Sequence, residues 1–268
     1  MTPGVSAGEP HYPVDARIVA PETRYEIIEG QLLETMAANE PHAIVNSRLA
    51  YVLEATVRSG FRCAVDMLTR LNRFSDMAPD ASVFPEERDE ETGGRKLEHL
   101  VFEVRDTQPF LDLVRKARLF TERGVRRVVC VDLPGNDVCV WSPADDVWIP
   151  LGDKGKVEDA ICLVRPLAAR SLLDAGAADE AAVRGLLRKK HPVLERALVQ
   201  REKRGEKRGE KRGEKRGRQE MLRRSIEDFC GFLGISLEDG RRQVLDNLDL
   251  QGLEALRERL IRERNWDR

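Results

Sequence analysis

Two acidic side chains in unusual sequence surroundings could carry out chemistry in this chain. Asp80 follows Pro79 directly before a short apolar run, and Glu103 stands inside the apolar stretch Leu-Val-Phe-Glu-Val. A carboxylate in a buried strand is costly unless it is paired or binds a metal. Mg²⁺ prefers oxygen ligands and is commonly held by one or two carboxylates together with water and substrate phosphate. The two acids therefore indicate a magnesium site, with Mn²⁺ as a substitute, in a hydrolase that acts on phosphodiesters.

Two basic residues near Glu103 complete this candidate site. Lys116 lies on the helix predicted after Glu103, from which its side chain can point back to the end of the strand, and Asp112 lies one turn earlier on the same helix. Arg105 follows Glu103 by two positions, so the two side chains share one face of the strand. We therefore expect Lys116, with Arg105, to orient a water molecule or to stabilise the charge of the transition state.

Each of these residues also has a plain structural interpretation. Glu103 alone is equally well explained by the solvent-facing side of a strand, or by an ion pair with Arg127 or Arg105. Asp112 and Lys116 have the spacing of an ordinary ion pair on a helix surface. Arg105 alone reads as a solvated residue at a strand end. The catalytic hypothesis therefore depends on the acids and Lys116 converging in space.

Other side chains are weaker candidates. Glu26 and Glu29 are further acids that could reach a metal, whereas His42, at the start of a predicted helix, has first of all a structural interpretation. The four histidines and five cysteines do not have the spacing of zinc ligands. The sequence contains no G-x-S-x-G, Walker A or G-x-G-x-x-G pattern, which argues against a serine hydrolase, a P-loop protein and a dinucleotide-binding enzyme.

Composition sets the broad class of protein. A chain of 268 residues, 41% of them apolar, can form one fair-sized domain and a smaller one. It has no apolar run of membrane-spanning length and no secretory pattern near residue 1, and its cysteines are scattered and odd in number. We therefore expect a cytoplasmic protein with reduced thiols.

The net charge of −2 conceals an asymmetry along the chain. Residues 201–218 hold ten Lys or Arg and four Glu, a net charge of +6, so the remainder carries −8. A nucleic-acid enzyme usually has a basic surface. The acidic remainder therefore counts mildly against a protein that binds DNA strongly on its own.

The hydrophobic periodicity predicts a mixed sheet followed by helices. A strand, a helix and a strand between residues 98 and 133 have the length of a parallel crossover, and hairpins elsewhere are antiparallel. Strands are expected at 24–30, 31–36, 62–71, 81–84, 98–104, 127–133, 138–141 and 147–151, helices at 41–59 and 108–123, and a mobile, unburied loop at 85–96. Asn39 is expected to cap the first helix and Gly60 to end it.

The chain becomes helical after Pro166. Helices are expected from Ser171 and over 179–190, and three short amphipathic helices after Glu220. We expect this tail to be too small for much of a core and to pack on the main domain or on a second copy, forming a homodimer. The expected domains are a flexible leader at 1–20, the main domain at 21–166, a helical extension at 167–200, a charged linker or helix at 201–218 and a helical interaction domain at 219–268.

Between Glu202 and Gly217 the chain repeats Glu-Lys-Arg-Gly four times. On a helix this period stacks like charges at i,i+4, and each glycine costs about 1 kcal/mol relative to alanine. The run is therefore a marginal solvated helix or an extended spacer, and its plain interpretation is a linker. The alternative is a basic arm that lies on nucleic-acid phosphates, although every fourth side chain is a glutamate that phosphates would repel.

An ordered set of short motifs carries a family resemblance. The chain resembles the Uma-two family of restriction-endonuclease-like proteins, a branch of the PD-(D/E)XK nuclease superfamily. The resemblance spans about residues 25–151, and no single motif in it is strong. Its motifs are Tyr-Glu-Ile-Ile-Glu-Gly ending at Gly30, His42 opening a helix, Pro79-Asp80, Val-Phe-Glu103-Val, Asp112 with Lys116, Gly124-Val125 and Val131-Asp132.

The resemblance implies an α/β fold with a mixed sheet flanked by helices, and a metal-dependent endonuclease that hydrolyses DNA. Asp80 and Glu103 match the two metal-binding acids, and Lys116 matches a lysine on the helix that follows them. The sequence departs from the family after Glu103, where Arg105-Asp-Thr-Gln-Pro replaces a Leu-Ser-Pro-Ser-Thr-like stretch, and where Phe120 replaces a tyrosine. The segment between Glu103 and Lys116 is also about one residue short. Because these departures flank the site, a weakly active or inactive nuclease fold, acting through its tail in nucleic-acid binding or regulation, remains the alternative.

Overall fold

The computed structural model describes residues 14–33 and 38–266. The chain divides into two compact units, Met1–Leu194 and Glu195–Arg268. The finer domain boundaries expected from the sequence remain predictions. Most of the expected leader, and the end of the strand expected at 31–36, lie outside the described residues.

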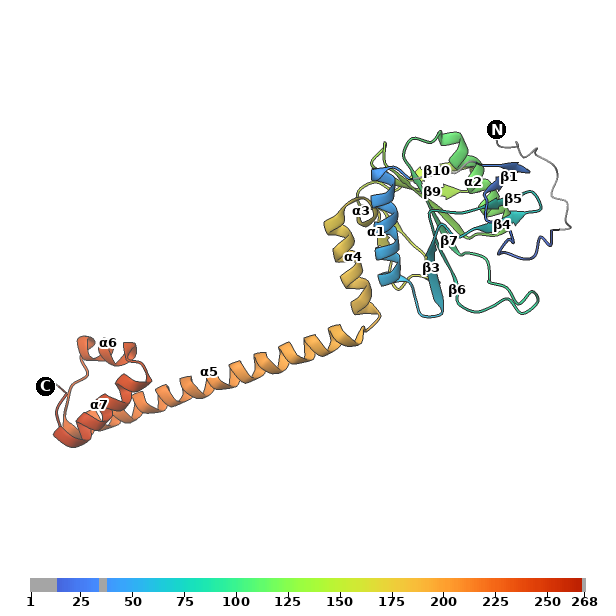
Figure 1. Ribbon diagram of the computed structural model, residues 1–268. Helices are drawn as coiled ribbons and strands as arrows, with labels where there is room; N and C mark the ends of the chain where they lie inside the picture. Colours follow the sequence, from blue (N-terminus) through green and yellow to red (C-terminus); the bar gives the residue numbers. More distant parts are fainter. Residues whose placement is uncertain (1–13, 34–37, 267–268) are drawn as a thin grey trace. The chain divides into compact units, whose positions relative to one another are not determined.

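The first unit combines strands and helices, as expected for the α/β class (Figure 1). Its helices are α1 (Glu40–Thr56), α2 (Phe110–Arg123), α3 (Arg170–Leu173) and α4 (Ala175–Arg188). Its strands are β1 (Ile27–Ile28), β2 (Gln31–Leu32), β3 (Phe61–Val65), β4 (Thr69–Asn72), β5 (Ser75–Met77), β6 (Ala81–Pro85), β7 (Leu100–Arg105), β8 (Arg127–Asp132), β9 (Asp137–Ser142), β10 (Val147–Pro150), β11 (Lys156–Val157) and β12 (Leu167–Ala168).

The main sheet has the strand order β10-β9-β8-β7-β6-β3. Its central neighbours β7 and β8 are parallel and are joined through α2, whereas the remaining neighbours are antiparallel. The predicted mixed sheet and its crossover are therefore confirmed. Both central strands are almost entirely buried, which explains their continuous apolar sequences.

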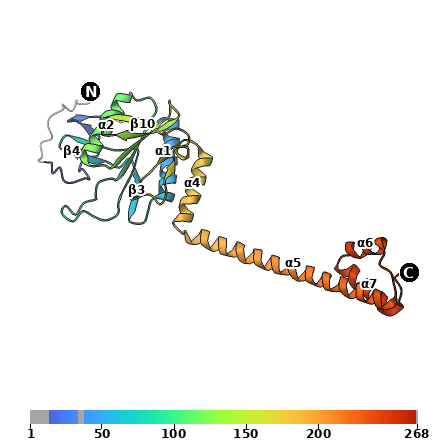
Figure 2. The same ribbon diagram turned by 180° about the vertical axis from the view of Figure 1, so that it is seen from behind.

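Each face of the main sheet is covered by a separate apolar core. Leu49 and Leu53 of α1 and Leu172 of α3 pack on one face, together with Phe102 and Val104 of β7. The other face packs against α2 and against a small sheet of order β2-β1-β5-β4. Figure 1 shows α1, α3 and α4 grouped together, with α2 on the opposite side of the sheet, and Figure 2 shows the same grouping from behind. The carboxyl end of β7 therefore lies between α1 and α2.

Local turns explain several boundaries. Glu29 and Gly30 both have positive φ, 50° and 81°, as the tight turn of the predicted β1–β2 hairpin requires. The single strand expected at 62–71 is wrong, because Asp66 has a φ of 49° and divides it into β3 and β4, which belong to different sheets. Gly60 does not end α1 as predicted. The helix ends earlier because Val57 becomes extended and bridges to Leu163.

The acidic segment at 85–96 also differs from its prediction. It was expected to bury nothing, but the Arg95 side chain is buried. Its guanidinium donates to Glu98 Oε1 at 2.5 Å and to Thr69 Oγ1 at 2.7 Å, so the charge is compensated inside the protein. A buried ion pair thus fixes the end of this loop to β4, which composition alone does not indicate.

The second unit consists of helices. Helix α5 (Pro192–Leu233) runs without interruption through the Glu-Lys-Arg-Gly repeats, so the first of the three short helices expected after Glu220 is its final part. Helices α6 (Asp239–Asn247) and α7 (Leu250–Glu263) follow. No helix among the described residues is long and apolar enough to span a membrane.

The tail has a core of its own, contrary to the expectation from its size. Ile226 and Cys230 of α5 pack with Leu245 of α6, with Leu253 of α7 and its neighbours, and with Trp266. The end of the long helix and the C-terminal tryptophan supply the apolar surface that the two short helices lack. Pairing of two copies through these helices stays a prediction.

The packing of α4 on α1 generates a test of the fold. A Cβ atom at Gly185 would lie 2.5 Å from the Ala55 carbonyl oxygen and 2.7 Å from Thr56 Cγ2. We expect Gly185→Ala to lower the free energy of unfolding by about 1–3 kcal/mol through overpacking, although alanine favours a helix by ~1 kcal/mol. Urea unfolding measures the change.

Gly176→Ala in the same helix is the matched control, because the nearest neighbour of its Cβ would be Asp174 Oδ1 at an ordinary 3.4 Å. Equal stabilities of the two variants would contradict the close approach of α4 to α1.

Candidate active site

The pairing of β6 with β7 determines where the two predicted acids stand. Ala81, the first residue of β6, pairs with Phe102 in antiparallel register. In this register Asp80, which precedes Ala81, lies across from Glu103, which follows Phe102. The backbone N–H of Val104 donates to Asp80 Oδ2 at 2.6 Å, which ties the Asp80 side chain to the end of β7.

The other Asp80 oxygen faces α1. His42 Nε2 lies 2.7 Å from Asp80 Oδ1, and Asn46 Nδ2 donates to the same oxygen at 3.4 Å. Hydrogen bonding to Asp80 raises the pKa of His42, although burial opposes it. Burial would raise the pKa of Asp80, but the hydrogen bonds from His42 and Val104 outweigh burial and lower it. Asp80 is therefore held as a carboxylate, because the neighbouring His42 favours the charged form of Asp80.

Asn39 aligns the start of α1 with this carboxylate. Its side-chain oxygen accepts a hydrogen bond from the His42 backbone N–H at 3.2 Å, so it caps the helix as predicted. Its amide nitrogen donates to the side chain of Asp106, just after β7. The first turn of α1 is thus connected to the strand that carries Glu103.

Glu103 pairs with Lys116 from α2. Lys116 Nζ donates to Glu103 Oε2 at 2.9 Å, and the Lys116 side chain is 18% exposed whereas that of Glu103 is 1% exposed. Burial raises the pKa of Glu103 to about 7, against the opposing effect of the lysine. Burial lowers the pKa of Lys116, but the charges of Glu103, Glu26 and Asp80 outweigh it and hold that pKa above its usual value. The pair is therefore a buried carboxylate and a strongly basic ammonium that share a hydrogen bond.

The plain interpretations of these residues are not what the structure contains. Asp112 is exposed, and Lys116 pairs with Glu103 and not with Asp112. Arg105 Nη1 donates to Asp132 Oδ1 at 2.7 Å, and its guanidinium lies over the Phe110 ring at 5.3 Å. The structure thus brings Asp80, Glu103 and Lys116 together and pairs Arg105 with an acid on the neighbouring strand.

Two further acids from the β1–β2 hairpin have different positions. Glu26 Oε1 accepts a hydrogen bond from the Ala78 backbone N–H at 2.7 Å, and its charge acts on both Glu103 and Lys116. Glu29 forms an exposed ion pair with Arg115. Glu26 therefore belongs to the surroundings of the site, and Glu29 to the surface.

Sequence reasoning missed Asn46 and undervalued His42. The two residues are one helical turn apart, so they project from the same face of α1. A polar pair at this spacing beside an apolar helix face was the signal that could have identified them. Asp66 was also missed, and burial and the Asp80 charge both raise its pKa. Its position after β3 gave no local signal.

The donor set fits a hard divalent cation. Glu103 Oε1 is buried and has no hydrogen-bond partner, whereas Oε2 is occupied by Lys116. Carboxylate oxygens are the ligands that Mg²⁺ prefers, and two of them suffice when water and phosphate complete the shell. No group of three or more His, Cys, Asp or Glu among residues 14–33 and 38–266 is arranged to hold a metal. A metal here would therefore depend on Asp80 and Glu103 alone among the acids that the structure describes.

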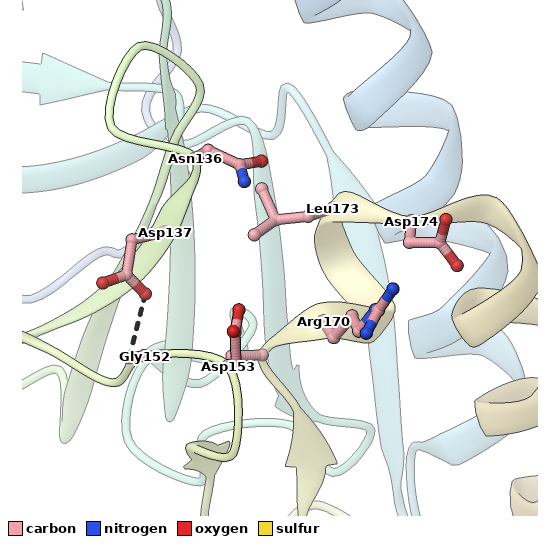
Figure 3. Close-up of a pocket in the computed structure, with 8 residues that line it drawn as sticks. Asn136, Asp137, Gly152, Asp153, Arg170, Leu173 and Asp174 are labelled. Carbon is pink, nitrogen blue, oxygen red and sulfur yellow. Dashed lines mark hydrogen bonds between the residues drawn. The ribbon is translucent and has the colours of Figure 1, made fainter.

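A separate pocket of about 360 Å³ includes none of these residues. Figure 3 shows Asp137 and Arg170 on its walls, which come from the turn before β9, the segment after β10 and helix α3. Asp137 Oδ1 accepts from the Gly152 N–H at 3.0 Å, and Asp174 accepts from the Ala177 N–H at the start of α4. These two acids therefore hold backbone segments in place beside the pocket.

Comparisons with known proteins give the family to which the chain belongs. No curated protein sequence matches the chain. Among solved structures, the chain is similar to the crystal structure of a putative nuclease belonging to DUF820 from Anabaena variabilis. Identity is 16% and the TM-score 0.47, over 62% of this chain and 99% of that one. The model of the Uma2 family, described as "Putative restriction endonuclease", matches residues 12–163, more than half of the sequence. The chain therefore belongs to the Uma2 family of restriction-endonuclease-like proteins.

Proposed function

We propose that this protein is a Mg²⁺-dependent endonuclease that hydrolyses phosphodiester bonds of DNA, with Mn²⁺ as a substitute metal. The observation that carries the proposal is the buried Glu103 carboxylate, which shares one oxygen with Lys116 and leaves the other unpartnered. A buried acid in a core strand is destabilising unless its charge is fully paired or coordinates a metal. Membership of a nuclease family supports a nucleic-acid substrate. A cytoplasmic location belongs to the same proposal.

In this proposal Asp80 and Glu103 hold the metal. When bound, Mg²⁺ would supply Lewis-acid stabilisation of the phosphoryl oxygens and lower the pKa of a coordinated water. His42 and the Val104 N–H orient Asp80 through contacts of 2.7 Å and 2.6 Å. Because both contacts favour the ionised form, Asp80 presents a negative charge at neutral pH.

Lys116 is the proposed donor at the reacting phosphate. Its ammonium keeps its proton because the surrounding carboxylates raise its pKa. It can therefore donate a hydrogen bond to the attacking water or to an oxygen that gains charge, and it is already aligned by Glu103. Arg105 would assist from the end of β7, where Asp132 and the Phe110 ring fix its direction.

The first prediction concerns the two acids. We expect Asp80→Asn and Glu103→Gln each to remove most Mg²⁺ affinity and to lower plasmid cleavage by roughly a thousandfold or more, since both metal and electrostatic stabilisation are lost. Calorimetric titration with Mg²⁺ and a plasmid-nicking assay measure the two effects. Asp112→Asn, an exposed acid beside the site, is the matched control and should behave as wild type. Wild type that neither binds metal nor cleaves DNA would support the inactive, regulatory alternative.

A second prediction separates the stability of the Glu103–Lys116 pair from its function. Lys116→Met leaves a buried acid without its cation, and we expect it to lower the free energy of unfolding by about 2–3 kcal/mol, near the bottom of the range for buried pairs because Lys116 is partly exposed. The double variant Glu103→Gln with Lys116→Met should recover much of this loss. Urea denaturation of the two single variants and the double variant gives the coupling energy. Additive effects would mean that the two residues do not interact.

A third prediction concerns Arg105. We expect Arg105→Gln to lower the cleavage rate by roughly 10- to 100-fold, the value of a charge-assisted hydrogen bond, with Mg²⁺ affinity unchanged. Asp132→Asn keeps the arginine and an oxygen that can accept its hydrogen bond, and removes only the charge of the acid, so its rate should stay within about threefold of wild type if Arg105 acts on phosphate. Equal losses of cleavage rate in both variants would mean that the Arg105–Asp132 pair supports the structure and that Arg105 does not act on the phosphate.

A further inference from the structure

The Glu-Lys-Arg-Gly run on α5 is a strongly charged surface that the proposed active site does not use. Every residue from 201 to 218 is exposed. In the described structure no residue from 202 to 217 forms an ion pair. The neighbouring Arg218 is different, because it pairs with Glu254 at 2.7 Å. The cationic groups within the repeats are therefore available to a partner.

The positive charge of the chain is concentrated in residues 201–218, which we call the arm. Residues 1–194, which include the proposed catalytic residues, carry 25 Lys or Arg and 31 Asp or Glu, a net charge of −6. Residues 195–268 carry 20 Lys or Arg and 16 Asp or Glu, a net charge of +4, of which 201–218 alone contribute +6. Phosphate contacts supply most of the sequence-independent affinity of DNA-binding proteins. A nuclease with an acidic catalytic unit needs that affinity from elsewhere in the chain.

The geometry of the repeat presents the cations together. Consecutive side chains on a helix are about 100° apart, so each Lys-Arg pair covers one side, with the glutamate and the glycine on the other. A four-residue period advances the pattern by about 40° per repeat, and the cationic stripe therefore winds slowly around the helix in a right-handed sense. The glycines on the opposite side have no atoms within 4 Å of the position of a Cβ, so no other part of the described structure packs against the helix there.

The composition of residues 201–218 excludes partners that bind through apolar surface. Residues 201–218 contain no apolar side chain, so the arm has no face that could enter a membrane. For the same reason it has no seam for a coiled coil, and two copies would each bring a charge of +6. Charge complementarity remains as the only source of binding, and it fits a polyanion.

We propose that the Lys and Arg side chains of residues 203–216 on α5 bind the phosphate backbone of duplex DNA without reading its sequence, and that this arm supplies most of the DNA affinity of the protein. The choice of duplex DNA as the polyanion rests on the proposed endonuclease function.

The test is DNA binding by the full chain in EDTA, where cleavage does not occur, measured by fluorescence anisotropy over a series of salt concentrations. Replacing Lys203, Lys207, Lys211 and Lys215 by glutamine should weaken binding at least about tenfold and make the plot of log affinity against log salt shallower by roughly 2–4, since each lost phosphate contact removes about 0.9. Glutamine and lysine have similar helix propensities, so circular dichroism should show the same helix content.

Two matched variants complete the experiment. The corresponding lysine-to-arginine variant keeps every charge and should bind as wild type. Replacing Glu202, Glu206, Glu210 and Glu214 by glutamine removes the repulsive charges and should strengthen binding. Unchanged affinity and salt slope in both glutamine variants would overturn the proposal and leave the arm as a linker. Binding of duplex RNA or heparin as tight as that of duplex DNA would overturn the choice of partner.

The outcome is independent of catalysis. If the wild type cleaves no DNA with any metal but the lysine-to-glutamine variant loses DNA affinity, the proposed DNA-binding role of the arm stands and the proposed endonuclease activity is rejected. Cleavage by a wild type whose affinity the arm variants do not change would retain the endonuclease and reject the arm.

Discussion

The burial of Glu103 in the central strand β7 is the constraint on which the rest of the first unit depends. A carboxylate that is only 1% exposed must be compensated, and the parallel crossover from β7 through α2 to β8 provides the compensation. Because the crossover returns α2 across the sheet, Lys116 comes within 2.9 Å of the acid that precedes it in the chain. The connection that builds the sheet thus also supplies the cation.

The antiparallel partner β6 completes the arrangement from the other side. Its register puts Asp80 across from Glu103, and two carboxylates this close repel each other unless cations or hydrogen-bond donors share their charge. His42 and Lys116 each take one acid, and the Val104 N–H adds a donor to Asp80. Burial raises the pKa of Glu103 to about 7 although Lys116 opposes the rise, whereas the hydrogen bonds to Asp80 outweigh its burial and lower its pKa. The two acids therefore have different protonation behaviour within one site.

Much of this could be predicted from the sequence because it is written in local patterns. The apolar run around Glu103, the amphipathic α2 and the turn at Glu29-Gly30 each depend on near neighbours in the chain. The end of α1 could not be predicted, because Val57 leaves the helix to bridge Leu163, far along the chain. The burial of Arg95 likewise depends on Glu98 and Thr69 coming together.

The site shows the same division between local and tertiary information. The spacing of Asp112 and Lys116 fitted an ordinary helix pair as well as a catalytic role, and only the burial of Glu103 decides which acid the lysine meets. His42 and Asn46 face Asp80 because Asn39 caps α1 and bonds to Asp106 after β7. The sequence predicts correctly that Asn39 caps the helix. The consequence of this cap, the alignment of His42 and Asn46 with Asp80, is visible only in the tertiary structure.

The separation of charge between the two units follows from the same electrostatics. A cation close to Glu103 or Asp80 pairs with it, as Lys116 and His42 do, so its charge is shared between the acid and any phosphate that it meets. Additional Lys or Arg side chains around these acids would also compete with a metal for their oxygens. A surface that binds phosphate is therefore compatible with such a site only where its cations cannot reach the carboxylates. The Lys and Arg side chains of residues 203–216 are exposed and form no ion pair in the described structure, so their charge is not shared in this way.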